Sequence, residues 1–415
     1  MPKEKIICGL DVGSSSIRLV VGQKSRPEEK LHIIGAAEAP AFGINKGMIT
    51  SIEDAVSSIS ACLEKAERMV GFSLTNAWVG VSGSHIISQE SKGVVAVSKS
   101  DGEIRETDVE RALEAAQAIA SPPNYEILHV IPRSFTVDNQ SGIKDPIGMT
   151  GIRLEVEAQI IQGLTSQIKN LTKAVYRTSL DVRGVVLGVL AGAEVVITPR
   201  QKELGAVVVN IGGSTTSLVV FEEGDVLHAA ILPLGSDHIT SDIAIGLRTS
   251  IDTAERIKIE FGSAVNLETG KRGQEILFSE VGGNEEGSFS KKYTAEIIEA
   301  RVEEIFEKVD KELKKIQRSG MMPAGVILTG GGSKLPNLVL AAKKKLRLPA
   351  TLGLPVNISS AIDKVNDLSY TTATGLVLWG EQAERQGSVQ GNFSKLTNWQ
   401  SVPEQAKKWL KSFWS

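Results

Sequence analysis

Two stretches of the chain repeat one pattern of apolar and polar positions. Each has a β-branched run, a short turn of glycine with serine or threonine, and a second apolar run; they are Ile6–Gly22 and Val207–Gly224. This pattern predicts a β-hairpin in both places. The hairpins align at one constant spacing, and the matched pairs are Asp11 with Asn210, Gly13 with Gly212, and Ser15 with Ser214. So distant a repeat predicts two similar lobes that face one another.

The two turns have the composition of phosphate-binding loops. Glycine lets the backbone approach a phosphate closely, and neighbouring N–H groups form an anion site. Ser14 and Ser15 add hydroxyl donors, and Arg18 carries a fixed positive charge just past the first turn. Asp11 is suited to hold the water shell of a Mg²⁺ ion. The alternative is that both are ordinary hairpins with small turns. Because the same motif occurs twice, the sequence favours a nucleotide cleft over this alternative.

A third glycine cluster and a charged helix follow. Ala324–Leu338 predicts a strand, a Gly330–Gly332 turn and then a helix, a unit that can place bare backbone against a nucleotide. Between the second and third clusters, Ser250–Gly262 predicts a helix on which Glu255 and Lys258 are i,i+3 neighbours. A plain surface ion pair is the alternative for these two residues.

In this order, the hairpins, the helix and the TGGGS loop resemble the actin/Hsp70/sugar-kinase ATPase superfamily. Within it, Ile127–Ile161 resembles the signature region of the FtsA family of bacterial cell-division proteins. The resemblance covers about Ile6 to Gly380. It implies an α/β, actin-like two-lobe ATPase fold with an inserted small α+β subdomain, plus a C-terminal amphipathic helix.

The resemblance also implies the domain boundaries. The first lobe would be 1–83, completed by about 164–198 and 361–380; the inserted FtsA-type subdomain 84–163; the second lobe 199–360, with its smaller subdomain at about 236–300; the linker 381–397; and the membrane-targeting helix 398–415. Within the insertion, Val79–Ser88 and Gly93–Ser100 predict strands. Thr107 and Glu110 predict a capping box that opens a helix, and Pro122 follows its end.

By the same resemblance, the site residues fall on known motifs. The first phosphate loop takes Asp11, Gly13, Ser14, Ser15 and Arg18; the second takes Asn210, Gly212, Gly213, Ser214 and Thr215; the adenosine loop takes Gly330, Gly331 and Gly332. Glu255 and Lys258 match positions that hold the ribose and adenine. Gly375, on the last predicted helix of the core, permits close packing between helices.

The chain departs from the superfamily at two positions of the second hairpin. Asn210 and Ser217 stand where the superfamily has aspartates. The linking segment Arg183–Glu194 offers no obvious carboxylate as a general base where sugar kinases need one. We therefore expect ATP and Mg²⁺ to bind with weak or absent hydrolysis, which favours a scaffold over a small-molecule kinase. The related type IV pilus assembly protein PilM is the other alternative.

The end of the chain predicts a membrane-binding helix behind a polar linker. Ser401 and Glu404 form a capping-box pattern, and Pro403 suits a first helical turn. One helical face takes Val402, Ala406, Trp409, Leu410, Phe413 and Trp414, and the other takes Lys407, Lys408 and Lys411. An aromatic face opposite a lysine face is typical of a helix lying in a bilayer interface. Packing on the protein's own body is the alternative.

Composition limits the partners and the cellular compartment that the protein is expected to have. The 415 residues carry a net charge of −3, so no overall basic field indicates nucleic-acid binding. Cys8 and Cys62 cannot form a disulfide framework and read as packed thiols of a reducing cytoplasm. The N-terminus does not read as a signal peptide, and no apolar run approaches the length of a membrane span.

The resemblance implies a scaffold that tethers the FtsZ ring to the cytoplasmic face of the membrane at the division site. It also implies recruitment of later division proteins and head-to-tail self-association into filaments. The FtsZ C-terminal peptide would dock on the smaller subdomain of the second lobe. The best matching element is the predicted helix Thr294–Phe306, and the residues expected to contact the peptide are Lys291, Lys292 and Arg301.

Overall fold

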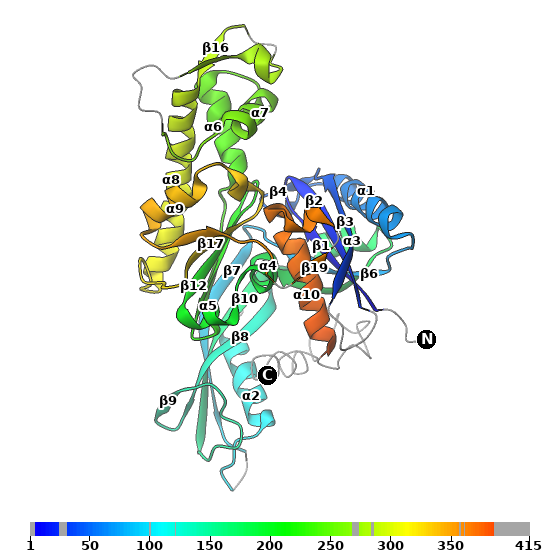
Figure 1. The fold of residues 1–415 in the computed structure, drawn as a ribbon. Helices are drawn as coiled ribbons and strands as arrows, with labels where there is room; N and C mark the ends of the chain where they lie inside the picture. Colours follow the sequence, from blue (N-terminus) through cyan, green and yellow to red (C-terminus); the bar gives the residue numbers. More distant parts are fainter. Residues whose placement is uncertain are drawn as a thin grey trace.

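Two helix-covered β-sheets form the lobes of the protein, and a third sheet forms a subdomain that projects from them (Figure 1). The computed structural model describes residues 5–24, 31–98, 101–120, 122–267, 274–283, 286–356, 358–360 and 362–385.

The first lobe is built on a six-stranded sheet with the order β11-β6-β1-β2-β3-β19. Its strands are β1 (Lys5–Val12), β2 (Ser16–Lys24), β3 (His32–Pro40), β6 (Asn76–Val81), β11 (Asp181–Leu187) and β19 (Ser359–Ser360). A two-stranded hairpin of β4 (Ile44–Asn45) and β5 (Met48–Ile49) lies beside it. The helices of this lobe are α1 (Ile52–Val70), α3 (Thr165–Tyr176) and α10 (Thr371–Arg385).

Helices cover both faces of this sheet, which explains why its strands are apolar throughout. Side chains alternate along β1, so Cys8 and Leu10 pack in the core that includes α1, while Ile7 packs with residues of α10. The Ser51 hydroxyl caps α1 by accepting from the N–H of Asp54. Cys8 and Cys62 are buried free thiols, as predicted.

The second lobe repeats this plan on a five-stranded sheet with the order β14-β13-β12-β17-β18. Its strands are β12 (Ala206–Ile211), β13 (Thr216–Glu222), β14 (Asp225–Leu232), β17 (Gly325–Thr329) and β18 (Ala350–Leu352). Its helices include α5 (Pro199–Leu204), α8 (Lys291–Lys315) and α9 (Leu338–Leu346), and α4 (Gly188–Val196) lies between the two lobes, in contact with α10, β12 and β13. A smaller part, at the top of Figure 1, holds α6 (Ser236–Leu247), α7 (Ile251–Phe261), β15 (Glu275–Leu277) and β16 (Ser288–Ser290).

Both predicted hairpins are present and in equivalent places. β1 and β2 pair antiparallel, as do β12 and β13, and the Gly/Ser turns lie between the paired strands. Each hairpin is joined to a parallel strand, β6 in the first lobe and β17 in the second. The duplication inferred from the sequence is therefore a duplication of structure.

The inserted subdomain has its own four-stranded sheet, in the order β7-β10-β8-β9. The strands are β7 (Ile86–Ala96), β8 (Tyr125–Val137), β9 (Gln140–Ile143) and β10 (Arg153–Leu164), and α2 (Glu106–Ala120) packs on them. A separate core, which includes Phe135 and Leu154, fills the space between sheet and helix.

Three details of the sequence interpretation were wrong. Val79–Ser88 and Gly93–Ser100 are not separate strands, because β6 ends at Val81 and β7 is continuous from Ile86 to Ala96. The α2 helix begins at Glu106, ahead of Thr107. Its start is held by the Asp108 carboxylate, which accepts from the N–H of Arg105. Asp108 is buried, and its carboxylate also accepts hydrogen bonds from the N–H and the hydroxyl of Ser98. These bonds hold the carboxylate in place at the start of the helix.

The third glycine cluster and the last helix also differ in extent from the prediction. After β17, Gly331–Lys334 form a 3₁₀ turn, and α9 starts only at Leu338. The α10 helix continues to Arg385, into the stretch predicted as linker from about Glu381. Glu381 stays helical because its carboxylate forms a buried ion pair with Lys24 at 2.7 Å. The remaining linker and the predicted membrane helix lie outside the described residues.

Candidate nucleotide-binding site

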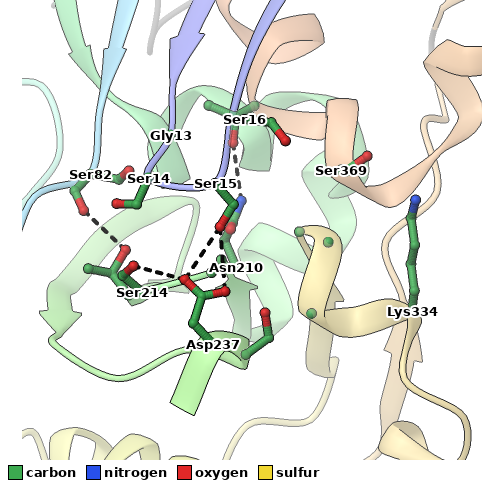
Figure 2. Close-up of a pocket in the computed structure, with 18 of the residues that line it drawn as sticks. Gly13, Ser14, Ser15, Ser16, Ser82, Asn210, Ser214, Asp237, Lys334 and Ser369 are labelled. Carbon is green, nitrogen blue, oxygen red and sulfur yellow. Dashed lines mark hydrogen bonds between the residues drawn. The ribbon is translucent and has the colours of Figure 1, made fainter. Parts of the chain in front are cut away.

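A cleft of about 580 Å³ lies between the lobes and is lined by both glycine-rich turns (Figure 2). Its size falls in the range of small-molecule sites. All of the nucleotide-binding residues predicted from sequence line it: Asp11, Gly13, Ser14, Ser15, Arg18, Asn210, Gly212, Gly213, Ser214, Thr215, Glu255, Lys258, Gly330, Gly331 and Gly332.

Neighbouring elements hold Ser14 of the first loop and Arg18 in fixed positions at the cleft. The Ser14 hydroxyl accepts from the N–H of Gly47, in the turn of the β4–β5 hairpin, at 2.9 Å. Arg18 is bound to Glu38 at 2.6 Å and lies over the ring of Tyr370, 5.7 Å from its centroid. These contacts fix the guanidinium at the wall of the cleft, so its charge acts on the site from a set position.

Asp11 is the carboxylate of the first hairpin and sits directly opposite Arg18 in the β1–β2 register. Burial raises the pKa of Asp11 to about 6, and the nearby Arg18 charge opposes that shift. A buried carboxylate with a raised pKa gains from a cation beside it. No group of three or more metal-ligating side chains occurs in the described residues, so phosphate and water oxygens would have to complete a Mg²⁺ shell.

The second loop carries no carboxylate at the corresponding position. The Asn210 side-chain N–H₂ donates to the hydroxyl of Thr372, on α10, at 3.1 Å. Ser217 is buried. The Thr215 hydroxyl donates to the carbonyl of Ser82, at 3.3 Å. Both bonds join the second lobe to elements of the first, so the loop also bridges the lobes.

The adenosine-type loop depends on glycine at Gly330. This residue has φ +84°, and a Cβ there would lie 2.5 Å from the Ile211 carbonyl oxygen. Next to it, a Cβ on Gly331 would meet only Ser369, at 3.8 Å. Gly331 therefore presents open backbone to the cleft.

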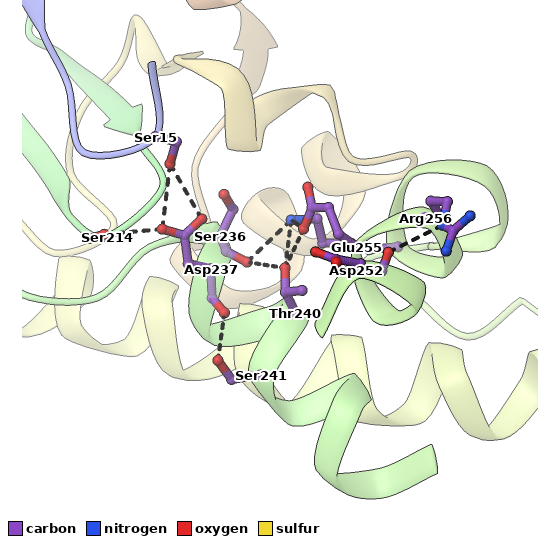
Figure 3. A network of polar contacts seen from close by, with 10 residues as sticks. Ser15, Ser214, Ser236, Asp237, Thr240, Ser241, Asp252, Glu255 and Arg256 are labelled. Carbon is purple, nitrogen blue, oxygen red and sulfur yellow. Dashed lines mark hydrogen bonds and ion pairs between the residues drawn. The ribbon is translucent and has the colours of Figure 1, made fainter. Parts of the chain in front are cut away.

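Glu255 and Lys258 lie on α7, and the Lys258 ammonium donates to the carbonyl of Ser236, the residue before Asp237, at 3.4 Å. The Lys258 ammonium is buried and donates to Glu255 at 2.6 Å and to the Thr240 hydroxyl at 2.8 Å. Thr240 also donates to Glu255, at 2.5 Å. Lys258 is buried while Glu255 is partly exposed, so the pair is not a plain surface ion pair; Figure 3 shows Glu255 and Thr240 of this network.

One carboxylate that lines the cleft, Asp237, was not predicted from the sequence. Asp237, in the first turn of α6, accepts from the Ser214 hydroxyl at 3.0 Å. It also lies 3.4 Å and 3.5 Å from the Ser15 hydroxyl of the other lobe (Figures 2 and 3). The available signal was the Gly235-Ser236-Asp237 start of a helix directly after an apolar strand. Thr372 and Ser82 were likewise missed, because single hydroxyls at element ends carry no pattern.

The residues predicted to contact the FtsZ peptide lie away from the cleft, on α8. Lys291 and Lys292 stand in its first turn and are half-buried. Arg301 already binds Asp242 through two nitrogens, at 2.5 and 2.9 Å, and also binds Glu304. It is therefore not an uncompensated cation.

The predicted membrane residues, Val402, Ala406, Lys407, Lys408, Trp409, Leu410, Lys411, Phe413 and Trp414, lie outside the described residues. Within the described part of the chain, no helix has the length and apolarity needed to cross a bilayer.

The fold, with a cleft between two lobes, defines an actin-like class of protein. Among solved structures, a chain of a PilM–PilN type IV pilus biogenesis complex matches with a TM-score of 0.67 at 17% identity, covering 90% of this chain and 98% of that one. MreB5 of Spiroplasma citri bound to ADP matches with a TM-score of 0.54 at 13% identity, covering 93% and 99%. At these identities the likeness establishes the fold alone.

The sequence comparisons identify the family. A model described as cell division protein FtsA matches residues 207–375, and one for the SHS2 domain inserted in FtsA matches residues 83–162. Cell division protein FtsA of Pseudomonas aeruginosa is 36% identical over 98% of both chains; that of Bacillus subtilis is 38% identical over 94% of this chain and 86% of its own. The chain belongs to the FtsA family of cell division proteins. The PilM alternative is a distant structural neighbour only.

Proposed function

We propose that this cell division protein is an ATP-binding, actin-like scaffold that tethers the FtsZ ring to the cytoplasmic face of the membrane and recruits later division proteins. The observation that carries the proposal is the cleft, in which two equivalent phosphate-type loops from opposite lobes meet. A ligand that contacts both loops fixes the angle between the lobes. It thereby sets the shape of the surface that each copy presents to the next.

ATP with Mg²⁺ is the proposed ligand, with Asp11 holding the cation through water. The MreB5 structure, which is bound to ADP, supports a nucleotide in this fold. Weak or absent hydrolysis is proposed because Asn210 is neutral and its amide is engaged by Thr372. No carboxylate of the linking segment reaches the cleft, where Gly188 and Val189 line the wall. Asp237 does line it, held by serine hydroxyls.

The start of α8 is the proposed dock for the acidic FtsZ peptide. Tyr293 is exposed there, and Ile245 of the neighbouring α6 is exposed over 78% of its surface. Lys291 and Lys292, beside exposed Tyr293 in the first turn of α8, suit an acidic peptide. Replacing both lysines with glutamate is expected to weaken binding of such a peptide at least tenfold, measured by fluorescence anisotropy.

The predicted C-terminal helix is proposed to bind lipid weakly in a single molecule and firmly in a filament that presents many such helices. Each lysine contributes about 1 kcal/mol near an anionic surface. Actin-like chains present different surfaces at their two ends, so we propose head-to-tail filaments. Many tails on one filament raise apparent affinity by about 10²–10⁴ without new contacts.

Co-sedimentation with anionic liposomes tests the tether. Trp409→Glu places a charge on the apolar face and is expected to release the protein, whereas Lys408→Ala is expected to weaken binding only to anionic lipid. Deletion of Gln400–Ser415 is the reference for complete loss. If that deletion leaves the pelleted fraction unchanged, the tethering proposal is wrong.

A further inference from the structure

Asp237 connects the two phosphate loops across the cleft. Its backbone N–H donates to the Gly213 carbonyl at 2.8 Å, and its carboxylate accepts from the Ser214 hydroxyl at 3.0 Å. The residue is therefore fixed to the second loop at the first turn of α6. From there its carboxylate lies 3.4 Å and 3.5 Å from the Ser15 hydroxyl of the first loop.

The loops are in close contact at this point. A Cβ on Gly213 would lie 1.9 Å from the Ser15 hydroxyl oxygen and 2.8 Å from an Asp237 carboxylate oxygen. The hydroxyls that Asp237 occupies are the same donors that a polyphosphate would use. Asp237 and the phosphates therefore compete for one set of hydrogen bonds, and both are anions.

No ion pair to Asp237 is found in the described residues, although Arg18, Lys258 and Lys334 line the same cleft. Arg18 is bound to Glu38, Lys258 to Glu255, and Lys334 to Asp367. A phosphate entering between the loops thus meets a carboxylate that forms no ion pair with any side chain in the described part of the chain. A divalent cation between the two anions would convert this repulsion into attraction.

We propose that Asp237 makes nucleotide binding in this cleft depend on a divalent cation. Its carboxylate contacts both loops, through the hydroxyls of Ser15 and Ser214. It yields these donors to phosphate favourably only when Mg²⁺ enters with the nucleotide. Asp237 is in this sense a positioning residue for the metal–nucleotide complex, and the inference rests on the proposed ATP binding.

The test compares the dissociation constant of ATP in excess Mg²⁺ with that in EDTA at equal ionic strength. Asp237→Asn keeps the shape and removes the charge. It is expected to tighten ATP binding in EDTA about tenfold, because repulsion at close range is lost, and to change binding with Mg²⁺ by about twofold or less. The ratio of the two constants should therefore fall about tenfold.

Two controls separate charge from fold. Asp252→Asn removes an exposed carboxylate from the first turn of the adjacent α7, outside the cleft lining, and should leave the ratio unchanged. Adenosine, which has no phosphate, should bind wild type and Asp237→Asn equally. Asp237→Ser, a second neutral variant that suits a helix start, should repeat the effect if Asn disturbs folding.

The outcomes are distinct. A fall in the Mg²⁺/EDTA ratio for the neutral variants, but not for Asp252→Asn, supports the inference. Equal weakening in both conditions, or an unchanged ratio, overturns it while the proposed ATP binding stands. If wild type binds no ATP with or without Mg²⁺, the proposed function fails and this inference fails with it.

Discussion

Asp11 and Asn210 occupy equivalent positions on the two hairpins, but their surroundings differ. Asp11 is half-buried opposite Arg18 with a pKa raised to about 6, whereas Asn210 is a neutral amide bound to Thr372. In the proposed metal–nucleotide complex, the hairpin carboxylate at this position would therefore come from the first lobe. The second lobe supplies its carboxylate from a different element, through Asp237 on α6.

Replacing Asp11 with Asn is expected to stabilise the nucleotide-free protein while weakening Mg²⁺–ATP binding. The raised pKa means that protonation stabilises the fold below pH 3.8, and that this contribution is lost as the pH rises through about 6. Asp11→Asn should thus raise the free energy of unfolding at pH 7.5 by about 2 kcal/mol and have little effect at pH 4. Urea unfolding at both pH values measures this. A destabilised variant at pH 7.5 would contradict it.

Gly331→Val is expected to abolish nucleotide binding without unfolding the protein. Its Cβ would meet only Ser369, so the branched side chain points into open cleft and takes the place of the nucleotide. Binding should weaken at least a hundredfold, with the melting temperature within about 2 °C of wild type. Gly330→Val is the contrast, because its φ of +84° and the nearby Ile211 carbonyl predict a destabilised fold. Normal ATP binding by Gly331→Val would exclude this loop from the site.

Sequence reasoning located the loop residues because each loop is contiguous and its composition is typical of phosphate binding. It could not locate Asp237, since the partners Ser214 and Ser15 are 23 and 222 residues away in the chain. Nor could it show that Arg301 is already paired, because Asp242 lies on another helix. Hydrogen bonds and ion pairs between residues far apart in the sequence could be found only once the fold had placed those residues together.

At the scale of elements, α10 is the last helix of the described core. It crosses the first lobe in close contact with α4, where a Cβ on Gly375 would lie 2.0 Å from the Ala191 carbonyl oxygen. The glycine there was read correctly from sequence. The end of the helix was predicted wrongly. The polar composition placed Glu381 in the linker, because its ion-pair partner Lys24 lies far away in the sequence, on β2.

Glu381→Ala should destabilise the protein by about 3 kcal/mol, because it leaves the Lys24 ammonium buried without its carboxylate. The double variant Lys24→Met, Glu381→Leu removes both charges and is expected to recover most of that loss. Arg68→Ala, in an exposed pair with Glu64, serves as the control and should change stability by less than about 1 kcal/mol. Equal destabilisation by the single and double changes would show that shape, not charge, holds the end of α10.

At the scale of the whole molecule, hydrogen bonds join three structural parts around the cleft. Asn210 to Thr372 and Thr215 to Ser82 connect the lobes. The inserted subdomain is joined through His129 of β8, whose Nε2 accepts from the N–H of Leu187 at 2.9 Å, immediately before α4. The proton of that imidazole must therefore be on Nδ1, and its ring packs edge-on against Trp379 of α10. The order of the elements was predictable from the resemblance, but these junctions were not.

Buried His85 and half-buried His129 make the fold sensitive to acid. Burial lowers the pKa of both His85 and His129 to about 4, and neither ring nitrogen of His85 has a hydrogen-bond partner among the described residues. Because the folded state excludes the charged form, stability is full above about pH 6.5 and falls as the pH drops towards 4. At pH 5 each histidine should lower the free energy of unfolding by about 2 kcal/mol relative to pH 7.5.

Replacing both histidines with glutamine should remove this loss, so that urea unfolding of His85→Gln, His129→Gln changes by about 4 kcal/mol less than wild type between pH 7.5 and pH 5. Absolute stability at pH 7.5 is expected to fall, since the imidazole packing is lost, and only the difference between the two pH values is diagnostic. His32→Gln is the matched control, because His32 lies exposed on β3 and its change should leave the acid loss intact. A double variant that loses as much stability as wild type on acidification would assign the effect to carboxylates instead.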